Sequence, residues 1–197
     1  MRPRSSPDLA RKLALMPEVE LVGLSAAGDR DAYGELVRRH ARFVRDLLRR
    51  MGADHALADD LAQDAFIEAL HSLPTYRLEA PFPAWIRTVA ARLYIRRRQK
   101  DARTVITAEP MADDPGDIEA ASSNDRLDLD TALKTLSPAE RLCVTLCHGA
   151  GLRQDEISEA LGVPLGTVKS HVTRGLKKLR RRLMLGEPPT KGGPQNG

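Results

Sequence analysis

The segment from residue 58 to residue 73 has the clearest periodicity in this chain of 197 residues. Its apolar side chains recur at intervals of three and four positions, which places them on one side of an α-helix. These positions are Ala58, Leu61, Ala62, Ala65, Phe66, Ala69, Leu70 and Leu73. Pro74 follows directly and ends the pattern. A helix with one continuous apolar side must bury it, so the segment predicts a core built from packed helices.

The rest of the chain also favours an all-α fold. Aromatic residues make up only 4% of the sequence. Asp29 or Asp31 is suited to cap a helix that ends near Met51. A further helix is predicted from about residue 84 to residue 98. Its buried side is expected to carry Trp85, Val89 and Leu93, with Ile86 and Ala90 beside them.

Composition also limits where the protein works. No apolar stretch of 18 residues is present, so the sequence predicts no membrane span. The N-terminus is basic but has no apolar region typical of a secretory signal. Cys143 and Cys147 are too few for a disulfide framework. We therefore expect a cytoplasmic protein.

The charges are distributed unevenly along the chain. Residues 92–103 hold six Lys or Arg and one acidic residue, and residues 164–185 hold seven and none. Between these blocks, residues 109–130 hold eight Asp or Glu and a single Arg. Two basic blocks separated by an acidic one are typical of two modules that meet a polyanion. Solvated helix faces would give the same pattern, so charge alone does not decide.

These features predict two small helical domains joined by a flexible acidic linker. The expected units are an N-terminal extension (1–17), a first domain (18–100), the linker (101–125), a second domain (126–186) and a disordered tail (187–197). Nearly extended, the linker would span on the order of 80 Å. The alternative for the linker is an acidic surface loop with one helical turn near residues 118–121.

The second domain contains a helix-turn-helix pattern in residues 151–170. Ser137, Pro138 and Glu140 form a capping box that begins an earlier helix, and Gly149 and Gly151 interrupt that helix near His148. The first helix of the motif holds Ile157, Ala160 and Leu161, and Gly162 allows the turn. The second helix begins near Gly166 and is expected to face inward with Val168, Val172, Leu176 and Leu179.

The outer side of this second helix suits a DNA groove. It carries Lys169, Ser170, Thr173, Arg174 and Lys177. Arg can bind guanine with two hydrogen bonds, Ser and Thr serve base edges or phosphate, and Lys neutralises phosphate. Thr167, at the helix start, is expected to bring backbone N–H groups toward a phosphate. The alternative is a helical hairpin whose basic face is only solvated.

Two blocks together resemble a bacterial RNA polymerase sigma factor of the extracytoplasmic-function (ECF) class. Residues 137–183, with the proline-initiated helix and the sequence GTVKS, are similar to the fourth conserved region of that class. Residues 31–98 are similar to the second region. There, ADDLAQDAFIEAL matches its acidic helix and FPAWIRTVAARLYIRRR its arginine-rich helix. Either block alone is a moderately specific sign of the ECF class, and the two blocks in this order are a strong one.

The resemblance implies partners and roles for matching residues. It implies that core RNA polymerase binds the acidic helix through Asp60, Gln63, Asp64 and Ile67. Duplex DNA of the minus-thirty-five element would meet Gln154, Asp155, Thr167, Lys169, Ser170, Thr173, Arg174 and Lys177. The minus-ten element would meet the loop residues Arg77, Leu78, Glu79 and Phe82, and phosphates of the opening DNA would meet Arg87, Arg92 and Arg96. An anti-sigma factor is also implied.

Several positions depart from the family pattern. His171 stands where the family often has Arg, and Gly175 stands where Ala is usual. Glycine lowers helix propensity by up to ~1 kcal/mol relative to Ala. The loop RLEAPFP is more apolar and richer in proline than the common type, which leaves its base preference open. Trp85 is expected in the core rather than stacked on a base.

The sequence predicts binding rather than catalysis. Cys143, Cys147 and His148 supply at most two well-placed ligands on one helix, whereas structural zinc requires four. We expect the cysteines to be helix-core residues, and we expect no metal site, cofactor or catalytic residue.

Two other functions remain possible at this stage. The chain would act as a sigma-like mimic if it sequestered an anti-sigma factor, but a mimic does not need the basic recognition helix. A stand-alone helix-turn-helix repressor would leave the acidic helix unexplained.

Overall fold

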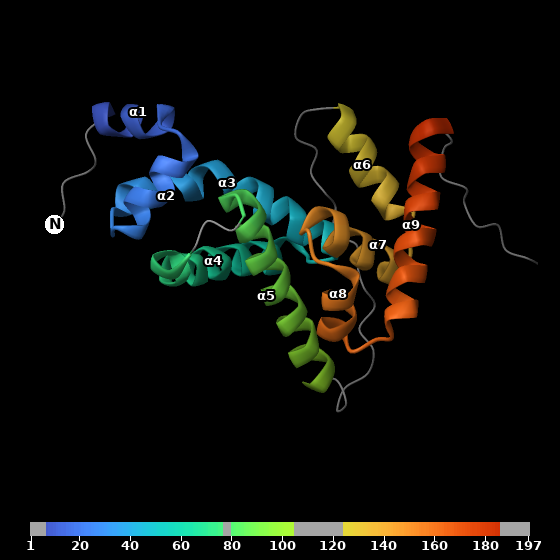
Figure 1. The fold of residues 1–197 in the computed structure, drawn as a ribbon. Coiled ribbons are helices and arrows are strands. Elements are labelled where there is room, and N and C mark those ends of the chain that lie inside the picture. Colours follow the sequence, from blue (N-terminus) through green and yellow to red (C-terminus); the bar gives the residue numbers. More distant parts are fainter. Residues whose placement is uncertain (1–6, 77–79, 105–123, 186–197) are drawn as a thin grey trace, which may run out of the picture.

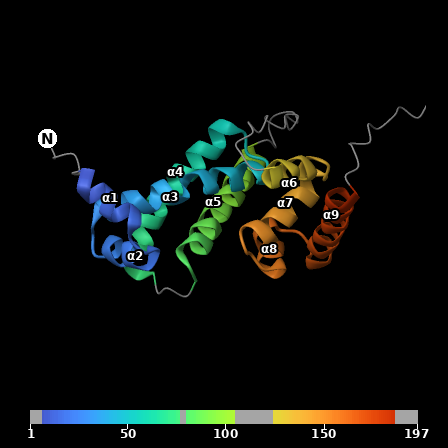
Figure 2. The same cartoon turned by 90° about the horizontal axis from the view of Figure 1, so that it is seen from above.

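The computed structural model describes residues 7–76, 80–104 and 124–185, and every regular element in these ranges is helical. The N-terminal group contains α1 (Pro7–Leu15), α2 (Glu18–Ala26), α3 (Arg30–Met51), α4 (His55–Ser72) and α5 (Phe82–Thr104). The C-terminal group contains α6 (Asn124–Lys134), α7 (Pro138–Val144), α8 (Gln154–Leu161) and α9 (Leu165–Leu185). Figures 1 and 2 show the two groups side by side. The all-α prediction with two helical domains is confirmed. Among the described helices, none is both long and apolar enough to cross a membrane.

Local capping explains where α3 and α4 begin. The Asp29 side chain accepts hydrogen bonds from the backbone N–H groups of Asp31 and Ala32, and Asp54 accepts one from Leu57. Gly52 ends α3 in the left-handed conformation, at a φ of 112°, which side chains other than Gly rarely adopt. The predicted helix from Asp29 to Met51 is therefore confirmed, and Asp29, not Asp31, caps it.

The apolar side of α4 is buried largely as predicted. Ala58, Leu61, Ala62, Ala65, Phe66 and Ala69 are all buried. Leu70, which the pattern also placed on this side, is 38% exposed. A 3₁₀ turn at Leu73–Thr75 then redirects the chain around Pro74, which lets Leu73 return to the core.

Helix α5 is longer than predicted and is rotated relative to the prediction. It runs from Phe82 to Thr104, so residues 101–104 of the expected linker are helical. Its buried side chains are Phe82, Ile86, Ala90, Ala91, Tyr94 and Ile95. The predicted set Trp85, Val89 and Leu93 is only half-buried. Tyr94 helps to set this rotation, because its hydroxyl donates to the Met51 carbonyl at 2.9 Å.

The N-terminal extension contains structure that the sequence reasoning missed. Helix α1 packs on α3, and Leu13 is buried there. Arg39 fastens the end of α1, since its Nη2 donates to the carbonyls of Leu13, Ala14 and Met16 at 2.9–3.0 Å. Glu35 holds the same guanidinium at 2.7 Å. The sequence placed residues 1–17 in an extension without predicted structure, whereas residues 7–15 form a helix that packs on the first domain.

The helix that precedes the helix-turn-helix begins as predicted and ends differently. Ser137 and Glu140 form the expected capping box, with Pro138 in the first turn. After Val144 the chain widens into a π-helical turn, Thr145–Gly149, in which the Ala150 N–H donates to the Thr145 carbonyl five residues earlier. Turns of this type are rare in proteins overall, but those that occur are often found at functional sites. The prediction of one continuous helix to His148 is corrected accordingly.

Helices α8 and α9 form the predicted helix-turn-helix. Gly162, at a φ of 66°, ends α8, and Val168, Val172 and Leu179 of α9 are buried. Leu176 was also predicted to face inward, but it is 36% exposed. Its neighbour Gly175 is buried and lies on the packed side of α9 instead. The remaining parts of the predicted linker (105–123) and the tail from residue 186 lie outside the described residues.

Candidate nucleic-acid interface

The outer face of α9 gathers the side chains that the sequence assigned to DNA. Lys169, Ser170, Thr173 and Arg174 line one open depression of about 340 Å³. All four are exposed. They lie close together because residues three and four apart share one side of a helix. The depression therefore presents two cations and two hydroxyls to one ligand surface.

A buried carboxylate lies beneath this face. Glu140 of α7 is only 4% exposed, and its Oε2 accepts a hydrogen bond from Lys178 Nζ at 2.6 Å. Its Oε1 lies 3.9 Å from Arg174 Nε. Burial opposes ionisation of Glu140, but the bonds from Lys178 and Ser137 outweigh it and hold the pKa of the carboxyl below its ordinary value. The ionised Glu140 thus restrains two cations of α9.

The close approach of α7 and α9 depends on Gly175. A Cβ at that position would lie 2.6 Å from Val144 Cγ2. In this chain an Ala at position 175 would collide with Val144 of α7. Gly175 lowers the helix propensity of α9 at this position, but it lets α7 and α9 pack more closely.

The remaining residues predicted for duplex DNA lie along α8 and α9. Thr167 and Lys177 are exposed on α9, and on α8 Gln154 is half-buried whereas Asp155 is exposed. Asp155 holds Arg153 at 2.9 Å. Hydrogen bonding from Arg153 lowers the pKa of Asp155 and keeps it ionised. Sequence reasoning missed Arg153, although a cation two residues before an acid at a helix start was a visible signal.

The three arginines predicted for minus-ten DNA all project from α5, and each already has a partner. Arg87 donates to the Pro83 carbonyl at 2.8 Å and to the Gly149 carbonyl at 3.2 Å. Arg92 lies 3.8 Å from Glu156, and Arg96 lies 2.7 Å from Glu68. The partners of Arg87 are backbone carbonyl oxygens, and the partners of Arg92 and Arg96 are carboxylate oxygens.

The loop predicted to bind the minus-ten element comes directly before α5. Arg77, Leu78 and Glu79 lie outside the described residues. Phe82 is 2% exposed and packs against the rings of His40 and Trp85, with centroids 5.5 and 5.7 Å away. The predicted contact of Phe82 with DNA is therefore wrong, because its ring belongs to the core. Trp85 is stacked on Tyr76 at 4.5 Å and is half-buried rather than fully in the core.

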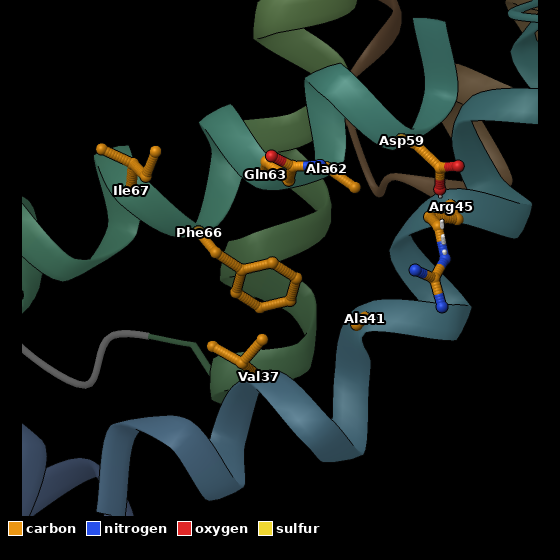
Figure 3. A pocket seen from close by; sticks show the side chains of 8 residues that line it. All are labelled: Val37, Ala41, Arg45, Asp59, Ala62, Gln63, Phe66 and Ile67. Carbon is orange, nitrogen blue, oxygen red and sulfur yellow. Dashed lines mark ion pairs between the residues drawn. The ribbon is translucent and has the colours of Figure 1, made fainter. Parts of the chain in front are cut away.

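A groove between α3 and α4 lies on another part of the N-terminal domain. It measures about 500 Å³, and Val37, Ala41, Ala62, Gln63, Phe66 and Ile67 contribute to its walls. Figure 3 shows the Phe66 ring of α4 pointing toward Val37 of α3, with Gln63 and Ile67 on α4 nearby. Arg45 and Asp59 form an ion pair of 3.6 Å between the two helices at one end of the groove. Ile67 is 55% exposed, and it lies beside the other apolar residues of this groove rather than alone on the surface.

The four residues predicted for polymerase contact separate into two sets on α4. Gln63 and Ile67 line the groove. Asp60 and Asp64 are exposed on the same helix but do not line it. An apolar groove with charged side chains at its edge, here Arg45 and Asp59, is typical of a protein-binding surface.

Comparisons with known proteins identify the family. Residues 36–104 match the family model "Sigma-70 region 2", and residues 126–179 match "Sigma-70, region 4". The chain is 31% identical to the ECF RNA polymerase sigma factor SigM of Mycobacterium tuberculosis, over 84% of each protein. The chain belongs to the ECF sigma factors. This sigma factor is also 36% identical to SigE of Mycolicibacterium smegmatis, over 79% of its own length and 64% of that relative.

Solved structures agree with the fold of this sigma factor. Its fold resembles that of the sigma factor RpoE of Bartonella quintana, solved together with the anti-sigma factor NepR, with a TM-score of 0.56. The two are 22% identical, and the similarity covers 79% of this chain and 98% of the other. The match supports the helical architecture described above.

No group of three or more potential metal ligands occurs among the described residues of the sigma factor. Cys143 is buried and Cys147 is half-buried, and neither forms a disulfide. Burial raises the pKa of the Cys143 thiol, and the neighbouring Cys147 adds to the effect. A neutral buried thiol behaves as a small apolar side chain, which agrees with the prediction of helix-core cysteines.

Proposed function

We propose that this sigma factor directs promoter-specific initiation by contacting duplex DNA, opening DNA and core RNA polymerase through three separate surfaces. The observation that carries the proposal is the exposed cluster of Lys169, Ser170, Thr173 and Arg174 on one face of the second helix of a helix-turn-helix. In such motifs the second helix reads base edges in the major groove.

The minus-thirty-five surface extends beyond this cluster. Thr167 and Lys177 lie on the same helix, and Gln154 and Asp155 begin the preceding one. We add Arg153, whose exposed guanidinium is held by Asp155 and is suited to a phosphate. Asp155 itself would act by orienting that guanidinium, since a carboxylate alone repels DNA.

The minus-ten surface is proposed for α5. Arg87, Arg92 and Arg96 carry it, together with the loop residues Arg77, Leu78 and Glu79, which lie outside the described residues. These arginines bind oxygen atoms of the protein, and the same groups are suited to phosphate oxygens, because a guanidinium donates several hydrogen bonds in one plane. Phe82 is not part of this surface.

The polymerase surface is proposed for the groove between α3 and α4. Ile67 and Gln63 would meet apolar and polar groups of the partner, and Asp60 and Asp64 would meet its cations. Exposed apolar area beside charged residues supports this assignment.

The organisation proposed for the chain has a polymerase- and minus-ten-binding domain (18–100), a linker (101–125, of which residues 101–104 extend α5) and a minus-thirty-five domain (126–186). We propose that it acts in the cytoplasm, where the polymerase acts, and by binding without catalysis or cofactor. An anti-sigma factor is proposed as a further partner, since the relative RpoE of Bartonella quintana was solved with one.

Run-off transcription with purified core polymerase tests the proposal. The sigma factor should give discrete transcripts from genomic promoter fragments, whereas core enzyme alone should not. A mimic would bind an anti-sigma factor but would start no transcript. A repressor would bind DNA in the absence of core enzyme and would lower transcription by another sigma factor. Either result would overturn the proposal.

A further inference from the structure

His171 of α9 stands where the family often has Arg, and none of the surfaces proposed above includes it. Its side chain is half-buried, whereas Arg174, three positions later, is exposed. Residues three apart share one side of a helix. Arg174 Nη2 lies 3.3 Å from His171 Nδ1, in hydrogen-bond contact. His171 therefore touches one of the residues proposed to face duplex DNA.

The chemistry of this contact determines which group donates. A guanidinium carries N–H donors and no acceptor, so His171 Nδ1 must accept the hydrogen bond from Arg174. The imidazole in this contact is therefore neutral and carries its proton on Nε2. An arginine at position 171 could not make the same bond, because two guanidinium groups can only donate.

A carboxylate approaches the same guanidinium from α7. Glu140 Oε1 lies 3.9 Å from Arg174 Nε. Glu140 is buried, and its other carboxylate oxygen accepts a hydrogen bond from Lys178 at 2.6 Å, so the carboxylate is fixed in place. Arg174 is thus restrained at Nε from α7 and at Nη2 from its own helix, although its side chain is 60% exposed.

We propose that His171 is a positioning residue that orients Arg174 toward one guanine of the minus-thirty-five element. Neither of the two contacts uses Nη1 of Arg174. Nη1 and the second hydrogen of Nη2 can therefore donate to guanine O6 and N7. Ordering a long side chain before DNA arrives reduces the conformational entropy that is lost on binding. This inference rests on the proposed role of α9 in minus-thirty-five recognition.

A direct contact between His171 and a phosphate would behave differently. Phosphate contacts act on all sequences alike and carry no base selection. A positioning residue acts only through Arg174, so the loss of His171 should change selection at the base that Arg174 reads. The same loss should have no effect once Arg174 is absent. The hydrogen bond to Arg174 and the half-buried position of His171 favour the positioning role.

Holoenzyme assembled from the full chain and core polymerase tests the proposal on promoter fragments with a randomised minus-thirty-five element. His171→Ala removes the acceptor. His171→Asn keeps one, because the Asn side-chain oxygen is attached to Cγ, as Nδ1 is in His. His71→Ala is the matched control, because it removes an exposed imidazole from α4, in the other domain. Circular dichroism checks that each variant is folded.

Wild-type holoenzyme should favour guanine at one position of the element. His171→Ala should bind the favoured sequence about three- to tenfold more weakly, since Arg174 must then be ordered on binding, and it should lose selection at that position alone. His171→Asn and His71→Ala should select as the wild type does. Added to Arg174→Ala, His171→Ala should have no further effect.

Three results on the promoter library would overturn the proposal. In the first, folded His171→Ala selects as the wild type does. In the second, His171→Asn loses as much selection as His171→Ala, so the acceptor is not what matters. In the third, the losses of His171→Ala and Arg174→Ala are additive, which assigns His171 its own contact with DNA.

The free chain provides a test that does not depend on DNA. Long-range ¹H–¹⁵N spectra at alkaline pH should show His171, assigned by its absence from His171→Ala, with its proton on Nε2. A proton on Nδ1 would overturn the proposal, because Nδ1 could not then accept from Arg174. If the proton is on Nε2 but wild-type holoenzyme selects no base in the minus-thirty-five element, the contact exists and the proposed role of α9 fails. The inference then fails with it.

Discussion

The carboxylate of Glu140 on α7 lies 2.6 Å from the ammonium group of Lys178 on α9. This pair joins α7 to α9, the second helix of the helix-turn-helix, and Glu140 is almost completely buried. The same carboxylate accepts the backbone N–H of Ser137 at 3.1 Å. One side chain therefore caps a helix and ties a second helix to it.

Glu140→Gln should lower the free energy of unfolding by about 1–2 kcal/mol at neutral pH, because a charged hydrogen bond becomes neutral while half-exposed Lys178 remains partly screened by solvent. The pKa of Glu140 in the folded protein lies below its ordinary value of 4.5. Its contribution is therefore complete above that value and is lost as the pH falls through the folded pKa.

Urea unfolding of both proteins at several pH values checks this prediction. The difference between wild type and Glu140→Gln should be constant near neutral pH and should shrink in acid. Glu35 titrates in the same direction in both proteins, so the difference isolates Glu140. A difference that stays constant into strong acid would assign the effect to packing instead of charge.

Gly175→Ala should destabilise the protein by ~1–3 kcal/mol, despite the better helix propensity of Ala, because its Cβ would lie 2.6 Å from Val144 Cγ2. Gly34→Ala on α3 is the matched control. Nothing lies within 4 Å of its added Cβ, so it should stabilise by up to ~1 kcal/mol. Thermal unfolding measures both changes, and Val144→Ala should rescue Gly175→Ala. Equal stabilisation by both glycine substitutions would show that α7 and α9 are not in close contact there.

Local signals in the sequence predicted much of this fold. Asp29, the Ser137–Glu140 capping box and the glycine at position 162 each act on neighbouring residues, so their effects are readable from spacing. The outer face of α9 was predicted for the same reason, since helical spacing alone brings Lys169, Ser170, Thr173 and Arg174 together.

Features that depend on distant residues were missed. Helix α1 is held by Arg39 on α3, and no local pattern marks that contact. The rotation of α5 follows from burial of Tyr94 near Met51, 43 positions earlier. Phe82 was misassigned to DNA because an aromatic residue in a loop has the same local signal whether it faces solvent or the core.

Ile67→Asp should weaken binding to core polymerase by ~2 kcal/mol or more, because a charge would replace the exposed apolar side chain of the α3–α4 groove. Val19→Asp on α2 makes the same chemical change at a side chain that is 69% exposed and lies outside that groove. It should leave binding unchanged. Surface plasmon resonance with immobilised core enzyme measures both. Normal association of Ile67→Asp would remove the groove from the polymerase interface.

Arg174→Ala and Lys177→Ala should affect promoter DNA in different ways. Arg174 lines the central depression of α9 and is suited to a base edge, so its loss should cost ~1–3 kcal/mol and relax selection at one minus-thirty-five position. Lys177 lies outside the depression and is suited to phosphate. Its loss should weaken all sequences alike and reduce the salt dependence by about one ion. Binding to a promoter library at two salt concentrations separates the two effects. If Arg174→Ala weakens every sequence equally, Arg174 contacts the backbone, and the residue that reads bases lies elsewhere on the helix.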